Sequence, residues 1–141
     1  MKCREVMSSN PRFCTPSAPT PEAAQIMKEE NVGIVPVVED TTSRKLVGVV
    51  TDRDLCLQVI VEDWQPSRVK VEECMTRNPV TCTPDDDLED AMELMEEHQV
   101  RRIPIVEKGG KLVGIIAMAD VAASATSSGD KAEVLEEVSK P

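Results

Sequence analysis

Aromatic side chains are scarce in this chain. Of its 141 residues only Phe13 and Trp64 are aromatic, and tyrosine is absent. Surfaces that bind single-stranded nucleic acid stack bases on aromatic rings, so this composition argues against such a surface. The net charge of -10 argues in the same direction, because nucleic acids and anionic membranes attract clustered Lys and Arg. An acidic surface is predicted, and a local basic pocket remains compatible with it.

Long apolar runs and paired cysteines are also missing. No stretch approaches the length of a transmembrane helix, and the first residues carry no apolar signal region. The cysteines are odd in number and show no CxxC or other zinc-ligand spacing; they are Cys3, Cys14, Cys56, Cys74 and Cys82. We therefore expect a cytoplasmic protein with reduced thiols, no metal site and no cofactor.

An internal duplication is the main feature that the sequence does contain. Residues 7–39 align with 75–107, and after a longer loop in the first copy 45–54 align with 111–120. The copies share Asn-Pro, Cys-Thr-Pro and Lys-Leu-Val-Gly in the same order. A period of about 67 residues that occurs only twice does not fit the common solenoid repeats. The sequence therefore predicts two paired units related by a pseudo-dyad.

Both copies predict the same order of elements. A short strand (12–15 or 80–83) precedes an amphipathic helix (21–30 or 88–98). Two β-rich runs follow, and a second helix starts after Thr51 and after Ala117. The β-rich runs are 34–38 and 46–51 in the first copy, and 102–106 and 112–117 in the second. The predicted fold class is α/β, in the α+β sense, with two βαββα units.

The predicted domain boundaries follow the repeat. Residues 1–61 form the first unit, 62–74 a linker, 75–125 the second unit and 126–141 a tail. The tail places Val134, Leu135 and Val138 at helical spacing. We expect it to be partly helical and to cover the protein's own core, with docking on a partner as the alternative.

Taken together, these motifs resemble a tandem cystathionine-β-synthase (CBS) domain pair, also called a Bateman module. The matching segments are the openings Met-Ser-Ser-Asn-Pro and Met-Thr-Arg-Asn-Pro, the strands around Pro36 and Pro104, and the run Gly48 to Asp54. The resemblance implies two units packed through their sheets, with clefts between them that bind AMP, ADP, ATP or S-adenosylmethionine. It also implies a regulatory module rather than an enzyme, a homodimer, and a regulated partner on a separate chain.

The run Thr51-Asp52-Arg53-Asp54 is the strongest site candidate. A carboxylate at the start of a helix can accept hydrogen bonds from both ribose hydroxyls. The neighbouring hydroxyl and helix N-terminus can hold a phosphate. The same Thr-x-x-Asp spacing is also a capping box, and one carboxylate can serve both purposes. In the second copy Asp120 is kept, but Ala117 replaces the threonine, so weaker binding is expected there.

Two further arginines extend the candidate site. Arg101 and Arg102 carry guanidinium groups that suit phosphate oxygens, or alternatively pair with Glu96 and Glu97. With adenine placed along the apolar strands, the ligand-binding residues implied by the resemblance are Thr15, Ile34, Val35, Pro36, Thr51, Arg53, Asp54, Thr83, Arg101, Arg102, Ile103, Pro104 and Asp120.

Other functions remain open on the sequence alone. The chain could be a ligand-independent dimerisation protein, which the loss of a hydroxyl at Ala117 would favour. It could also be a thiol- or metal-based stress sensor that uses the duplicated Cys14 and Cys82, although small core residues copied by duplication explain them equally well. We expect His98 to be a surface residue at a helix end, and Asp85-Asp86-Asp87 to complement a helix start rather than bind metal.

Overall fold

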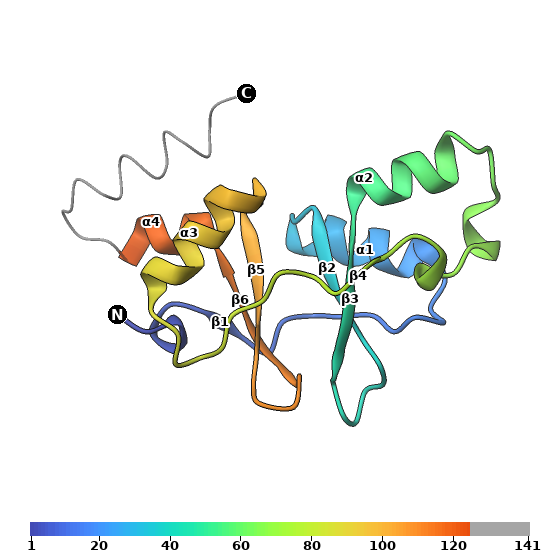
Figure 1. The fold of residues 1–141 in the computed structure, drawn as a ribbon. Helices are drawn as coiled ribbons and strands as arrows, with labels where there is room; N and C mark the ends of the chain where they lie inside the picture. The colour runs from blue at the N-terminus through green and yellow to red at the C-terminus, as the bar shows by residue number, and fades with distance from the viewer. Residues whose placement is uncertain (125–141) are drawn as a thin grey trace. The chain divides into compact units, whose positions relative to one another are not determined.

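Two compact units make up the part of the chain that this computed structural model describes, residues 1–124. The central unit is Arg12–Pro79, and the split unit combines Met1–Pro11 with the chain from Val80 onward (Figure 1). Each unit contains helices and one three-stranded sheet, which confirms the predicted α+β class. None of the helices within residues 1–124 is long and apolar enough to cross a membrane.

The sheet of the central unit is built on one hairpin. Strands β2 (Ile34–Val38) and β3 (Leu46–Thr51) pair antiparallel, and β4 (Thr76–Arg77) adds to the other edge of β3. Helix α1 (Thr20–Glu30) precedes the hairpin. Helix α2 (Asp52–Leu55) follows it and continues as a π-helical turn, Cys56–Ile60. Because alternate strand residues face opposite sides, one face of the sheet packs on the helices, through Val35, Val37, Val50, Ala23, Ile26 and Met27.

The split unit repeats this plan. Strands β5 (Arg102–Val106) and β6 (Leu112–Ala117) form the hairpin, and β1 (Ser8–Ser9) pairs with the free edge of β6. Helices α3 (Leu88–His98) and α4 (Met118–Ser124) cover one face of this sheet (Figure 1). The core between them is apolar and includes Ala91, Met95, Ile103, Ile105, Ile116 and Val121.

The sequence repeats exchange their opening segments. Strand β1 opens the first repeat, yet it pairs with β6 in the split unit, where Ser8 lies opposite Ile115. Strand β4 opens the second repeat, yet it pairs with β3 in the central unit, where Thr76 lies opposite Val49. The compact units therefore do not coincide with the repeats as the sequence divides them.

A glycine in each hairpin permits this pairing. A Cβ at Gly48 would lie 2.6 Å from the carbonyl oxygen of Thr76. A Cβ at Gly114 would lie 2.6 Å from the Met7 sulfur and 3.0 Å from the carbonyl oxygen of Ser8. Any larger residue would separate the opening segment from the hairpin, which explains why Val-Gly recurs in both copies.

Most elements lie where the sequence predicts them. Both hairpins have the predicted bounds, and α1 and α3 start within one residue of prediction. The predicted strands 12–15 and 80–83 are wrong in extent, because only Cys14 and Cys82 form β-bridges, with Val37 and Ile105. Turns that begin at Thr15 and Thr83 carry the chain away after one residue. The tail prediction lies outside the described residues.

Candidate functional site

Thr51 and Asp54 cap one another where β3 passes into α2. The Asp54 amide donates to the Thr51 hydroxyl oxygen over 3.0 Å, and the Thr51 amide donates to Asp54 Oδ2 over 2.9 Å. This is the capping box that the sequence predicts. Both residues are half-buried. Within residues 1–124 the second carboxylate oxygen, Oδ1, accepts no hydrogen bond, so the box leaves one acceptor available to a ligand.

The second copy keeps half of this arrangement. The Ala117 amide donates to Asp120 Oδ2 over 3.2 Å, which matches the bond between Thr51 and Asp54. Ala117 has no hydroxyl to accept the amide proton of Asp120. The carboxylate therefore stays oriented by the backbone while the polar group beside it is lost.

Strand pairing brings the predicted residues together within each unit. Ile34 lies opposite Thr51 in the β2–β3 hairpin, and Arg102 lies opposite Ala117 in the β5–β6 hairpin. Directly paired residues share a face of the sheet, so Ile34 and Thr51 lie on the face away from the helices. At the same end the Asp52 amide donates to the carbonyl oxygen of Gly33 over 2.9 Å.

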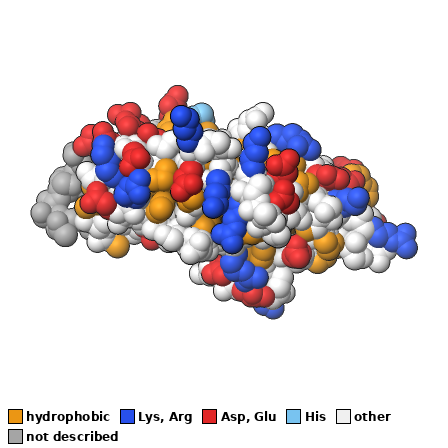
Figure 2. Space-filling view, turned by 90° about the horizontal axis from the view of Figure 1, so that it is seen from below, with side chains coloured by type: hydrophobic (Ala, Val, Ile, Leu, Met, Phe, Trp, Pro, Cys, Tyr) orange, Lys and Arg blue, Asp and Glu red, His pale blue; other side chains and the backbone are white. Residues whose placement is uncertain are grey.

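The split unit presents cations at this end. Its Met118 amide donates to the carbonyl oxygen of Arg101 over 2.8 Å, so Arg101 occupies the place that Gly33 has in the central unit. Arg101 is exposed and Arg102 is half-buried. Within residues 1–124 neither forms an ion pair, so the alternative pairing with the acidic end of α3 is not observed. Figure 2 shows the opposite side, where the hairpin loops lie, with Lys and Arg side chains in several places among acidic ones.

The predicted apolar contacts differ in their exposure. Val35 and Ile103 are fully buried and belong to the clusters that pack on the helices. Pro36 and Pro104 alternate with them on the opposite face of their sheets and are buried as well. Ile34 is half-buried. A ligand at the hairpin end would therefore meet the side chain of Ile34, and the buried residues mainly through their backbone.

Thr15 and Thr83 lie away from the residues around Thr51 and Asp120. Cys14 pairs in parallel with Val37, so Thr15 follows toward the end of β2 opposite Ile34. In the split unit the same geometry holds for Thr83, whose amide donates to Asp86 over 2.8 Å. Neither threonine is brought to the Thr51 or Ala117 end of its hairpin.

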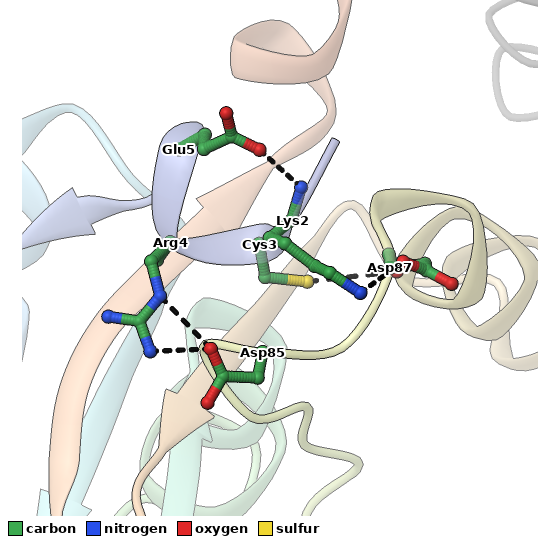
Figure 3. A network of polar contacts seen from close by, with 6 residues as sticks. All are labelled: Lys2, Cys3, Arg4, Glu5, Asp85 and Asp87. Carbon is green, nitrogen blue, oxygen red and sulfur yellow. Dashed lines mark hydrogen bonds and ion pairs between the residues drawn. The ribbon is translucent and has the colours of Figure 1, made fainter.

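The acidic run 85–87 binds the start of the chain (Figure 3). Lys2 Nζ lies 2.8 Å from Asp87 Oδ1, and Arg4 Nη2 lies 2.6 Å from Asp85 Oδ1. Asp87 is the N-cap residue of α3, as the predicted helix-start role requires, but its side chain makes no capping hydrogen bond, and Asp86 accepts from the Thr83 amide. These pairs were not foreseen from the sequence. The sequence features that could have predicted these ion pairs are the basic residues Lys2 and Arg4 and the acidic run 85–87, which has no counterpart in the first copy.

The histidine and the duplicated cysteines differ in exposure. His98 is exposed at the end of α3. Cys14 and Cys82 are each 3% exposed, and burial raises the pKa of both thiols to about 12. Such thiols are poor nucleophiles, because the thiolate is the reactive form. Within residues 1–124 there is no group of three or more His, Cys, Asp or Glu residues that could hold a metal ion.

The chain belongs to the CBS domain family. The family model matches it twice, over residues 3–60 and 71–126. Two proteins of Bacillus subtilis (strain 168) are similar over nearly their whole length. The uncharacterized protein YlbB is 37% identical over 99% of this chain and 92% of its own length. The CBS domain-containing protein YhcV is 36% identical over 96% and 94%.

Solved CBS pairs share the fold. The Hypoxic Response Protein I structure, which holds two coordinated zinc ions, has a TM-score of 0.79 and 27% identity, covering 89% of this chain and 100% of that one. CBSX2 in complex with AMP has a TM-score of 0.75 and 31% identity, covering 88% and 95%. The CBS domain pair of MJ0100, with 5-methylthioadenosine and S-adenosylmethionine, has a TM-score of 0.74 and 25% identity, covering 87% and 94%.

Proposed function

We propose that the chain is a ligand-sensing regulatory module that binds an adenosine-containing small molecule, and that Asp54 holds its ribose. The observation that carries this proposal is the Asp54 carboxylate, which is oriented by one oxygen in the capping box and keeps the other available. A carboxylate fixed in this way accepts charge-assisted hydrogen bonds from ribose hydroxyls without first reorienting. The AMP complex of CBSX2 and the S-adenosylmethionine complex of MJ0100 support the ligand class.

The rest of the ligand is assigned from the same strand ends. Adenine lies against Ile34 and the strand backbone leading to Pro36, or against the strand before Pro104 in the second copy. Phosphates, where the ligand has them, are held in the central unit by Thr51 and Arg53, and in the split unit by Arg101 and Arg102. The arginines support this role because guanidinium groups stay charged and bind phosphate oxygens in a bidentate manner. AMP, ADP, ATP and S-adenosylmethionine are the candidates. The module acts as a homodimer on a separate regulated protein and is not itself an enzyme.

A calorimetric panel tests this proposal. AMP, ADP, ATP, S-adenosylmethionine and NAD are titrated into the full chain, and thermal shifts are recorded in parallel. At least one adenosine ligand is expected to bind with a dissociation constant below about 1 mM, which corresponds to about 4 kcal/mol. If no member of the panel reaches that affinity, the sensing function is wrong and a ligand-independent dimerisation protein becomes the better description.

Asp54→Asn separates ribose binding from capping. The amide oxygen of Asn can still accept the Thr51 amide proton, so the fold is retained while the charged acceptor is lost. Binding is expected to weaken by about tenfold or more, in keeping with the loss of a charge-assisted hydrogen bond. Asp120→Asn is the matched control in the split unit, and it is expected to have the smaller effect. Equal affinities for Asp54→Asn and the unmodified chain would contradict the assignment of the ribose.

A further inference from the structure

Cys3 and Cys82 form a buried pair of thiols inside the split unit. Cys3 is 0% exposed and Cys82 is 3% exposed, and both belong to the apolar cluster under α3. Burial raises the pKa of both thiols, and each thiol lies close enough to the other to contribute to the shift. The Cys3 amide also donates to the carbonyl oxygen of Asp86 over 2.9 Å, which fixes the backbone of the first residues beside the turn that follows Cys82. Within the split unit, the cysteine near Cys82 is therefore Cys3.

The other copy has the same backbone and a valine in place of Cys3. Val71 occupies the place of Cys3, since its amide donates to the carbonyl oxygen of Ala18 over 2.8 Å, as that of Cys3 does to Asp86. Val71 and Cys14 share the core cluster of the central unit. Cys14 is also 3% exposed. The chain thus contains two equivalent positions, Cys3 beside Cys82 in the split unit and Val71 in the central unit, whose cluster also contains Cys14 and Cys74.

The Cys3 site also differs from the Val71 site in how it is held. Val71 is continuous in sequence with the rest of its unit, whereas Cys3 belongs to the segment Met1–Pro11, which is separated in sequence from the rest of the split unit. This segment is secured by the ion pairs of Lys2 with Asp87 and of Arg4 with Asp85 (Figure 3), all of whose side chains are more than half exposed. Exposed ion pairs are individually weak and are screened by salt. Transient release of the segment would expose Cys3 to solvent.

We propose that Cys3 and Cys82 form an intramolecular disulfide. The oxidant is a low-molecular-weight disulfide such as oxidised glutathione. In the first step the Cys3 thiolate of a released segment attacks one glutathione sulfur, and the other glutathione leaves as a thiolate. In the second step Cys82, which release of the segment uncovers, attacks the Cys3 sulfur as a thiolate and expels the second glutathione. Two thiol protons are lost from the chain, two electrons pass to the oxidant, and two reduced glutathione molecules result.

The disulfide closes the segment onto the split unit. Strand β1 and Met7 follow Cys3 directly, and Ser8 and Ser9 pair with Ile115 and Gly114 of β6. Oxidation therefore retains the third strand of this sheet, and reduction leaves it held only by the ion pairs and the hydrogen bonds of β1. The result is a redox-dependent latch on one of the two units.

The experiment uses the full chain with Cys56→Ser, which removes the exposed thiol and with it intermolecular crosslinks. After incubation with oxidised glutathione, non-reducing peptide mapping is expected to find one Cys3–Cys82 peptide and a loss of two hydrogen atoms from the chain. The oxidised chain is expected to melt roughly 5–15 °C higher than the reduced one, as for a native crosslink that closes a long loop. Cys3→Val copies the residue of the other unit, and it is expected to fold and to lose both effects.

Two variants make the test specific. Val71→Cys places a thiol near Cys14 and is expected to yield a peptide in which Cys14 is crosslinked to the introduced thiol. Lys2→Gln with Arg4→Gln is expected to speed formation of the Cys3–Cys82 disulfide several-fold at low salt, and high salt is expected to do the same in the unmodified chain. A stable glutathione adduct on Cys3 without the crosslink, a different cysteine pair, or the same oxidation in Cys3→Val would each overturn the proposal.

Discussion

Thr51 and Asp54 exchange backbone hydrogen bonds through their side chains, over 3.0 Å from the Asp54 amide to the hydroxyl and 2.9 Å from the Thr51 amide to the carboxylate. Thr51→Ala removes the bond from the Asp54 amide to the hydroxyl and keeps the bond to the carboxylate, which is the arrangement found at Ala117 and Asp120. The free energy of unfolding is expected to fall by about 1 kcal/mol, the usual cost of losing an N-cap hydroxyl. Urea denaturation measures it, and Thr51→Ser, which keeps the hydroxyl, is the control that should stay near the unmodified value.

The reverse change is available in the split unit. Ala117→Ser supplies a hydroxyl to accept the Asp120 amide proton, next to the bond that the Ala117 amide already gives to Asp120. Because Ala117 is buried, the added oxygen atom also costs packing energy. The gain in unfolding free energy is therefore expected to be smaller than for an exposed N-cap hydroxyl, about 0.5 kcal/mol. The same variant is expected to strengthen binding of a phosphate-bearing ligand in calorimetry. Unchanged binding would show that the hydroxyl at this position does not contact the ligand.

A side chain introduced at Gly48 would clash with backbone, whereas one introduced at Gly114 would clash first with a flexible side chain. A Cβ at Gly48 meets the Thr76 carbonyl oxygen at 2.6 Å, whereas at Gly114 the atom at 2.6 Å is the Met7 sulfur. Both alanine variants are expected to lose about 1–3 kcal/mol of unfolding free energy, with Gly48→Ala the more costly because a strand must move. A double-mutant cycle is expected to show that Met7→Ala relieves part of the cost of Gly114→Ala. Additive costs would contradict this account.

The attachment of the first residues depends on pH at both extremes. The hydrogen bond and charge of Lys2 lower the pKa of Asp87 below 3.8, and the same pair raises the pKa of Lys2 above 10.5. The stabilisation by the carboxylate is therefore present above about pH 4 and is lost as the pH falls through the lowered pKa. The stabilisation by the ammonium group is fully present below about pH 10.5 and is lost as the pH rises through the raised pKa.

Hydrogen exchange of the amides of Cys3 and Arg4, which donate to Asp86 and Pro84, measures this attachment. Their protection relative to unstructured peptide is expected to fall below about pH 4 and above about pH 10.5. The double variant Lys2→Gln with Asp87→Asn is expected to show lower protection near neutral pH and a flatter profile. An unchanged profile in that variant would mean that the pair does not secure the segment.

Thiol reactivity separates exposed from buried cysteines. Burial raises the pKa of Cys14 to about 12, so at pH 8 only about one molecule in ten thousand carries its thiolate. Cys56 is exposed. Alkylation with iodoacetamide followed by mass mapping is expected to modify Cys56 first, with Cys14 reacting only after addition of urea. Rapid modification of Cys14 in the folded chain would restore the thiol sensor based on Cys14 and Cys82.

The parts of the structure that follow from local pattern were predictable. The runs 34–38 and 46–51 form a hairpin because they are rich in β-branched apolar residues and because the loop between them is polar, and the second copy repeats this. The Thr51–Asp54 box follows from the spacing of two residues on either side of a helix start. The predicted strand 12–15 was too long, since periodicity alone does not show that the turn at Thr15 ends the pairing after Cys14.

By itself, the sequence determined that the chain is duplicated, which hairpins it forms and where a carboxylate caps a helix start. Only the tertiary structure decided which opening segment joins which hairpin, because Ser8-Ser9 and Thr76-Arg77 carry no pattern that selects a partner strand. The choice rests on close approach at Gly114 and Gly48, between residues distant in sequence. The same long-range docking brings Cys3 to Cys82. Alignment of the repeats would have matched Cys82 only with Cys14, since local spacing does not encode contacts made by a chain end.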